Sequence, residues 1–206
     1  METIFQLIDD GDAEGVRALL AGDPGAAAAR DAQGLSALMR AFYAGGGEIA
    51  DAILAARPAL DPWDRLLAGE AGGLPPADAR SPDGFTPLHI AVFARNEGAV
   101  RALLAAGADP NALSTAPFAQ VTPLGTAATF GATELAEILL DHGADTERTA
   151  DHGNTPLHSA VAGGSRALVE LLLARGANPY AELPDGRSAR DLAPNDEIRA
   201  LVSEQL

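Results

Sequence analysis

The sequence contains no cysteine, which excludes disulfide bonds and thiolate metal sites. Basic residues are also scarce: the chain has 14 basic and 29 acidic residues, which gives a formal net charge of -15. Such a negative field repels phosphate backbones and anionic membrane surfaces, so neither nucleic acid nor a membrane is an expected partner. The acidity is explained either by solubility or by attraction to a basic partner.

Long hydrophobic runs are missing as well. No apolar segment reaches the roughly 18 residues that a membrane span needs. Residues 1–5 lack the basic stretch followed by a long apolar run that is typical of a signal peptide. We therefore expect a cytoplasmic protein. Aromatic residues make up only 4% of the chain, so the position of each one is informative.

Apolar residues are nevertheless plentiful, at 47% of the sequence, which is enough for a continuous core. Much of this fraction is alanine, a small residue with a high helix propensity that suits closely packed helices. The composition therefore predicts an all-α fold.

A short motif recurs along the chain at steps of 36, 33 and 33 residues. Its copies are Thr86-Pro87-Leu88-His89, Thr122-Pro123-Leu124-Gly125, Thr155-Pro156-Leu157-His158 and Ser188-Ala189-Arg190-Asp191. Threonine before proline suits the start of a helix, because the hydroxyl accepts a free backbone N–H and proline has none to leave unpaired.

A second marker keeps the same register. Paired leucines, as at Leu103-Leu104, are followed by Gly107-Ala108-Asp109, Gly143-Ala144-Asp145 and Gly176-Ala177-Asn178. The leucines indicate the buried side of a second helix, and the glycine suits the left-handed residue that ends it. The predicted unit is a helix, a turn, a second helix and an extended loop.

This combined pattern resembles the ankyrin repeat family, in a bacterial-type form with about six to seven repeats including caps. The match is strongest over residues 84–112, 121–146 and 153–179. The resemblance implies a solenoid of stacked antiparallel helix pairs with hairpin-like finger loops. It also implies that protein partners bind on the concave face, at the finger tips and late in each first helix.

We predict a single domain over residues 1–206. Its repeats are expected at 2–33, 34–59, 60–80, 81–113, 114–149 and 150–182, with a C-terminal cap at 183–206. The interval from Ser36 to Thr86 is too long for one unit and too short for two, and 72–76 is a Gly/Pro segment where a second helix should be. Residues 60–80 are therefore interpreted as a truncated repeat, with a hinge as the alternative.

The register implied by the family places most of the scarce aromatics at binding positions. The predicted partner-binding residues are Tyr43, Phe85, Phe93, Phe118, Thr129, Phe130 and Asn154. Exposed aromatics are enriched at protein interfaces. Two alternatives stay open: Phe93 and Phe130 fill gaps between alanine-rich helices, or Phe118, in a finger with three extra residues, folds back over its neighbour.

Two positions depart from the family pattern. Gly125 replaces the usual histidine, so one hydrogen bond between fingers is expected to be missing there. Arg95 stands where the other turns have glycine, which costs about 1 kcal/mol if the left-handed conformation is kept. The alternative is that Asn96 takes up that conformation instead.

The sequence contains no phosphate-binding loop, nucleophile elbow or paired-histidine motif, and we predict no catalytic residues, cofactor or metal. His142 and His152 lie near aspartates but belong to an ordinary repeat junction. The leading functional hypothesis is a monomeric protein–protein interaction module rather than an enzyme, with a partner of unknown identity. The alternative is an acidic inhibitor or immunity protein that blocks the basic active site of a toxin or enzyme.

Overall fold

The computed structural model describes residues 3–56, 58–117 and 120–203, and these form helices without a β-strand. The elements in chain order are α1(Ile4–Asp9), α2(Ala13–Gly22), η1(Pro24–Ala28), α3(Ala37–Tyr43), α4(Gly47–Ala55), α5(Pro62–Leu67), α6(Pro87–Phe93), α7(Glu97–Ala105), α8(Pro123–Thr129), α9(Thr133–Asp141), η2(Asp151–Gly153), α10(Pro156–Ala162), α11(Arg166–Ala174), η3(Ala189–Leu192) and α12(Asp196–Ser203). The predicted all-α class is confirmed.

The recurring threonines begin helices as expected. The side chains of Thr86, Thr122 and Thr155 each accept a hydrogen bond from the backbone N–H three residues later. Proline follows as the first helical residue in all three cases. Each cap is worth about 1 kcal/mol. The register read from the sequence is therefore the register of the helices.

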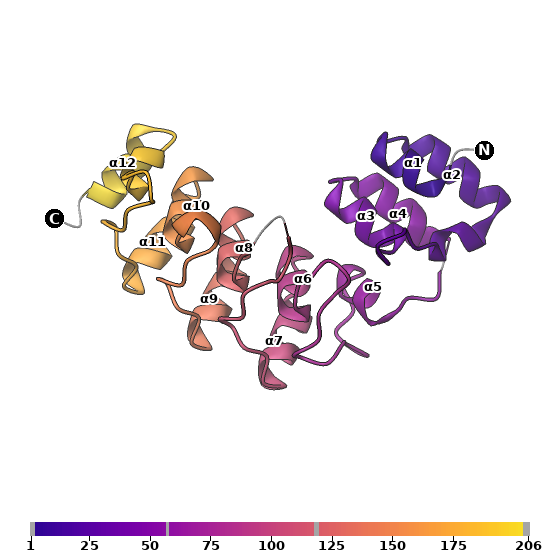
Figure 1. Ribbon diagram of the computed structural model, residues 1–206, viewed down its shortest axis with the longest axis horizontal. Coiled ribbons are helices and arrows are strands. Elements are labelled where there is room, and N and C mark those ends of the chain that lie inside the picture. The colour runs from indigo at the N-terminus through magenta and orange to yellow at the C-terminus, as the bar shows by residue number, and fades with distance from the viewer. Residues whose placement is uncertain (1–2, 57, 118–119, 204–206) are drawn as a thin grey trace.

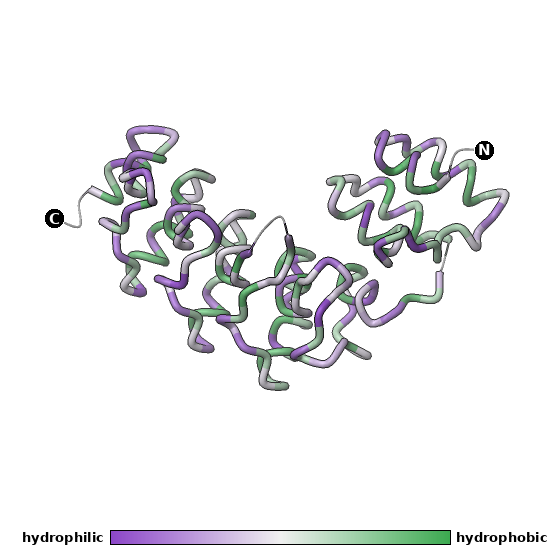
Figure 2. The backbone as a smooth tube through the Cα atoms, viewed as in Figure 1, coloured by the Kyte–Doolittle hydropathy of each residue, from purple (hydrophilic) through white to green (hydrophobic). Residues whose placement is uncertain are grey.

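The helices form two layers along an arch (Figure 1). The short helices α6, α8 and α10 line its inner side, and α7, α9 and α11 form its outer side. A continuous core fills the space between the layers, with Leu88, Leu124 and Leu157 almost fully buried on the inner helices. Figure 2 shows the hydrophobic residues concentrated in the helices. Because each pair buries its apolar side against its neighbours, the fold is a solenoid.

The outer layer is interrupted after α4. Helix α5 packs against α3 on one side and α6 on the other. No second helix follows it in residues 68–86, all of which the structure describes. Instead, the side chain of Asn96 donates hydrogen bonds to the carbonyls of Leu66 and Glu70, at 3.1 and 2.8 Å. Helix α5 thus contacts both of its neighbours. That residues 60–80 form a truncated repeat, with a hinge as the alternative, stays a prediction, and this segment is called the truncated repeat below.

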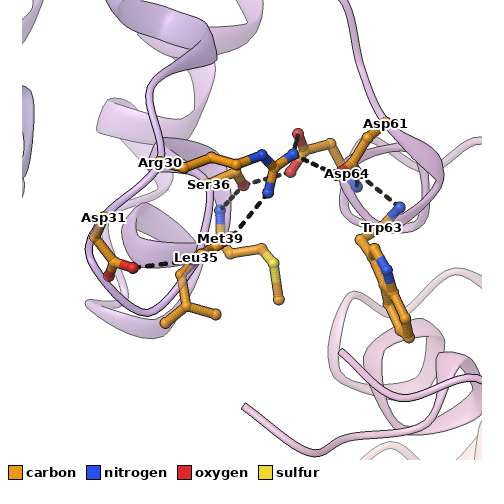
Figure 3. A network of polar contacts seen from close by, with 9 residues as sticks. Arg30, Asp31, Leu35, Ser36, Met39, Asp61, Trp63 and Asp64 are labelled. Carbon is orange, nitrogen blue, oxygen red and sulfur yellow. Dashed lines mark hydrogen bonds and ion pairs between the residues drawn. The ribbon is translucent and has the colours of Figure 1, made fainter. Parts of the chain in front are cut away.

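The start of α5 is a variant of the Thr-Pro-Leu-His motif (Figure 3). Asp61 caps the helix by accepting from the backbone N–H groups of Trp63 and Asp64, both at 2.8 Å. Asp64 stands at the position that His89 and His158 hold in two of the regular repeats, and it accepts a hydrogen bond from the Ser36 hydroxyl at 2.5 Å. Burial raises the pKa of Asp64. Arg30 forms an ion pair with Asp61 and lies 3.9 Å from Asp64, so polar contacts tie α5 to the preceding repeat.

The left-handed turn before α7 is formed by Arg95, with φ 54°, and not by Asn96. Asn96 is held elsewhere, because its side chain caps α7 through the N–H of Ala99 at 3.0 Å while also reaching the truncated repeat. The guanidinium of Arg95 donates to the carbonyl of Phe130 at 2.5 Å, a contact that offsets part of the backbone strain.

Candidate functional site

A groove of about 390 Å³ opens on the inner helices and is here called the aromatic groove. It is lined by Tyr43 of α3, by Ile90, His89 and Phe93 of α6, by Thr126, Thr129 and Phe130 of α8 or its C-terminal end, and by the finger residues Phe85 and Val121. The lining thus combines the ends of three inner helices with the residues just before two of the capping threonines.

Three rings form a row along the groove. The ring centroids of Tyr43 and Phe93 are 5.5 Å apart, and those of Phe93 and Phe130 are 5.2 Å apart. Phe42 also contacts Phe93, with ring centroids 6.5 Å apart in an edge-to-face arrangement. These are separations at which aromatic pairs attract. The row is therefore a continuous apolar surface contributed by non-adjacent parts of the chain.

The row spans the truncated repeat, which has a small residue at the equivalent position. Tyr43 and Phe93 are each the seventh residue counted from the first residue of their helix. In α5 the same position is held by Ala68, the C-cap residue. Alanine has only a methyl group, so this position of α5 adds no third ring between Tyr43 and Phe93.

The floor of the groove is uncharged at neutral pH. His89 Nε2 lies 2.8 Å from the carbonyl oxygen of Val121, which can only accept, so Nε2 carries the proton. Nδ1 then accepts from the Thr86 hydroxyl at 2.7 Å. Burial, with a smaller contribution from the charge of Arg80, lowers the pKa of His89 to about 4. Histidine here links two neighbouring fingers without bringing a charge into the groove.

Two of the rings remain open to solvent. The exposed fraction is 37% for Tyr43 and 48% for Phe130, while Phe85 and Phe93 are partly buried. The ring of Phe85 is tilted against that of His89, with centroids 5.8 Å apart. The groove therefore presents aromatic surface that the folded chain does not cover.

A second hollow of about 530 Å³, here called the N-terminal hollow, adjoins the groove and shares Tyr43 with it. Its lining is Asp9, Gln33, Leu35, Arg40, Tyr43, Ala44, Pro82, Asp83 and Pro117. Burial and the neighbouring Asp83 carboxylate raise the pKa of the Tyr43 hydroxyl, so it stays protonated at neutral pH. The two hollows differ in character, because the groove is apolar and the N-terminal hollow carries carboxylates.

The structure brings together five of the seven predicted site residues. Tyr43, Phe85, Phe93, Thr129 and Phe130 all line the aromatic groove. Asn154 does not line it, and its amide donates to the carbonyl of Asp151 within its own finger, at 3.3 Å. Phe118 lies outside the described residues.

Sequence reasoning missed four lining residues of the groove, namely His89, Ile90, Val121 and Thr126. The signal for Val121 was present, because it precedes Thr122 just as Phe85 precedes Thr86. His89 is the fourth residue of the recurring motif that starts the helices. Its place in the motif gave no sign that one side of the ring also faces the groove.

Neither the groove nor the rest of the described chain shows a grouping of metal-ligating side chains. None of the helices in the described ranges is long and apolar enough to cross a bilayer. What the groove offers chemically is apolar contact area, flanked by hydroxyl and carboxylate groups.

Comparison with known proteins gives a family. A search of curated proteins finds no relative that matches the chain significantly. The family model described as ankyrin repeats (3 copies) matches residues 4–114 and 113–182, which is most of the sequence. The match spans the truncated repeat as well as the regular units and agrees with the helix pairs of the structure. The chain belongs to the ankyrin repeat family.

Proposed function

We propose that this chain binds a protein partner through the aromatic groove, as a binding module without catalytic activity. Ankyrin repeats are in general protein–protein interaction modules. The observation that carries the proposal is the row of Tyr43, Phe93 and Phe130, which leaves aromatic surface exposed on the inner side of the repeat stack.

Aromatic residues are effective at interfaces because they bring large contact area at a small cost in side-chain entropy. The aromatics of this chain are few, yet four of them line one groove. Filling of gaps between alanine-rich helices accounts for Phe93, which is partly buried among other rings. It does not account for the exposure of Tyr43 and Phe130.

The net charge of -15 favours a second candidate, an acidic inhibitor or immunity protein that blocks a basic active site. An inhibitor of this kind would bind mainly through charge, and its complex would dissociate as salt screens the charges. Binding through the aromatic groove is apolar and persists in salt. The two candidates therefore differ in the salt dependence of their complexes.

The test is affinity capture of proteins from the source cells, quantified by mass spectrometry, at low salt and at about 0.5 M salt. The bait is the wild-type chain, a Tyr43→Ala/Phe130→Ala variant or a Tyr180→Ala control. Tyr180 is 53% exposed and does not line the groove. The Tyr180→Ala control therefore removes an exposed aromatic ring, as the double variant does, but leaves the groove unchanged.

We expect at least one captured protein to be retained at high salt, to be lost with the double variant and to remain with the Tyr180→Ala control. Capture that is abolished by salt but indifferent to the double variant would support the acidic inhibitor instead. Capture that depends on neither salt nor the groove would contradict both candidates.

A further inference from the structure

The aromatic groove and the N-terminal hollow adjoin at Tyr43, which lines both, and the two hollows together are here called the cleft. One end of this cleft is the apolar row that ends at Phe130. The other end is flanked by Asp83 and Asp9. A ligand that fills both hollows therefore meets an apolar surface at one end and negative charge at the other.

The charges of the N-terminal hollow do not balance. Arg40 is already used, because it forms ion pairs with Asp9 and, at 3.7 Å, with Asp31. Asp83 has no ion-pair partner among the described residues. One of its oxygens, Oδ1, accepts from the Ser81 hydroxyl at 2.5 Å. Its Oδ2 is buried and has no hydrogen bond of standard geometry within the described ranges, although the Tyr43 hydroxyl is a donor close to this carboxylate.

A carboxylate removed from water without a compensating charge is costly. A cation placed in the N-terminal hollow would lower that cost, and the face of the Tyr43 ring would add a cation–π attraction. The net charge of -15 draws basic partners toward the chain before contact. Charge complementarity thus selects a positively charged group for this end of the cleft.

The spacing limits how far apart the two ligand groups lie. The three rings of the row are separated by 5.5 and 5.2 Å, a span that an extended peptide crosses in about three residues at ~3.3 Å each. Asp83 lies close enough to Tyr43 for its carboxylate to act on the Tyr43 hydroxyl, so a side chain near Phe130 and a cation beside Asp83 belong to residues about two to four apart.

We propose that the cleft binds an extended peptide segment of the partner that carries one bulky apolar side chain and, two to four residues away, a lysine or arginine. The apolar side chain packs in the aromatic groove, and the cation lies in the N-terminal hollow beside Asp83. This assignment rests on the proposed function and specifies which kind of protein segment the groove recognises.

The first test is selection of a random-sequence peptide library, displayed on phage, against the full chain. Baits are the wild type, Phe130→Ala, Asp83→Asn and Asp185→Asn. Asp185 is the matched control, because it precedes a finger glycine as Asp83 does but is paired with Arg187 at 2.7 Å. Thermal melting of each bait verifies that it is folded.

We expect the wild type and the Asp185→Asn control to enrich peptides that contain both groups at this spacing. The Asp83→Asn bait should keep the apolar preference and lose the basic one. The Phe130→Ala bait should lose the apolar preference. An Asp83→Lys bait should exchange the basic preference for an acidic one, which separates a charge effect from a loss of folding.

A zero-length carbodiimide cross-link gives a second, independent measurement. All 14 basic residues of the chain are arginine, so no lysine of its own competes for activated carboxylates. A lysine-containing peptide from the selection should cross-link at Asp83, and Asp83→Asn should remove that product. The same substitution should weaken peptide binding by about tenfold, measured by fluorescence anisotropy.

The outcomes separate this inference from the proposed function. Peptides that depend on Phe130 but show no basic preference, or cross-links spread over other acidic residues, would overturn the inference and leave groove binding intact. Failure to enrich any peptide would also overturn it, because the cleft would not accept an extended segment. Loss of the groove-dependent capture described above would instead refute the proposed function.

Discussion

The rings of Tyr43 and Phe93 are in contact, with centroids 5.5 Å apart, although helix α5 lies between them in the chain. The contact is made across a shortened repeat whose equivalent residue is Ala68. The candidate site is therefore centred on the least regular part of the solenoid. Sites of function are where departures from local regularity are expected.

The two phenylalanines of the row should differ in their contribution to stability. Phe93 is partly buried against three other rings, so Phe93→Ala should lower the free energy of unfolding by about 2–3 kcal/mol. Phe130 is 48% exposed, and Phe130→Ala should cost less than about 1 kcal/mol. Urea unfolding followed by circular dichroism measures both. Equal losses would show that Phe130 serves the scaffold and not the site.

Gly125→His should stabilise the chain. Glycine in a helix interior costs about 1 kcal/mol relative to alanine, and a histidine there can repeat the finger-linking hydrogen bond that His89 makes. A Cβ at Gly125 would lie 3.3 Å from Thr122 Oγ1, so the threonine must move by a few tenths of an ångström. We expect a gain of about 1–2 kcal/mol in thermal unfolding. Gly125→Ala isolates the helix-propensity part, and a histidine variant less stable than it would disprove the added bond.

The turn at Arg95 stores measurable strain. Its φ of 54° is the left-handed conformation, which glycine adopts freely and other residues do not. Arg95→Gly and Arg95→Ala both remove the guanidinium contact with Phe130, so they differ only in the backbone. The glycine variant should be the more stable by about 1 kcal/mol in chemical denaturation. Equal stability would mean that the turn relaxes when the arginine is removed.

Folding stability should fall as the pH drops from about 6.5 to about 4, through His89. Its pKa is about 4 in the folded chain and about 6.5 when unfolded, so below the higher value the unfolded state binds more protons. Above about pH 6.5 His89 is neutral in both states and costs no stability. Below that pH the free energy of unfolding decreases, and the decrease levels off below about pH 4. The free energy of unfolding, measured by urea denaturation, should be lower by on the order of 2 kcal/mol at about pH 5 than at neutral pH.

His89→Gln keeps a donor for the Val121 carbonyl but cannot titrate. Its stability should therefore depend less on pH over the same range, and the difference between the two chains isolates His89 from the carboxylates. Burial also lowers the pKa of His158, which leaves a residual slope of the same sign in the variant. Identical slopes would place the pH dependence elsewhere.

The regular repeats were predictable because their local signals agree with one another. Thr86, Thr122 and Thr155 cap helices, and Gly107, Gly143 and Gly176 all have positive φ. Binding positions followed from that register, which is why five predicted residues meet in one groove. The repeat boundaries proposed from the sequence remain predictions.

The rest depended on contacts that no local pattern encodes. Asp61 and Asp64 replace threonine and histidine of the motif, and Asp64 hydrogen-bonds backward to Ser36 where His89 reaches forward to the next finger. The alternative that Asn96 takes the left-handed turn was wrong, because its side chain is needed by the truncated repeat. The contact between Tyr43 and Phe93 could likewise not be predicted from the sequence, because it depends on the distance at which α5 holds their two helices.

The interruption of the outer layer after α4 has a consequence for cooperativity. In a repeat protein each unit is stabilised by itself and by its interfaces with two neighbours. Between α4 and α7 that interface relies on the inner helices α3, α5 and α6, so the coupling is smaller there than along the regular array. Hydrogen exchange should then divide the chain into two cooperative blocks. Since Tyr43 and Phe93 lie on opposite sides of this junction, a ligand in the groove would join the blocks into one unfolding unit.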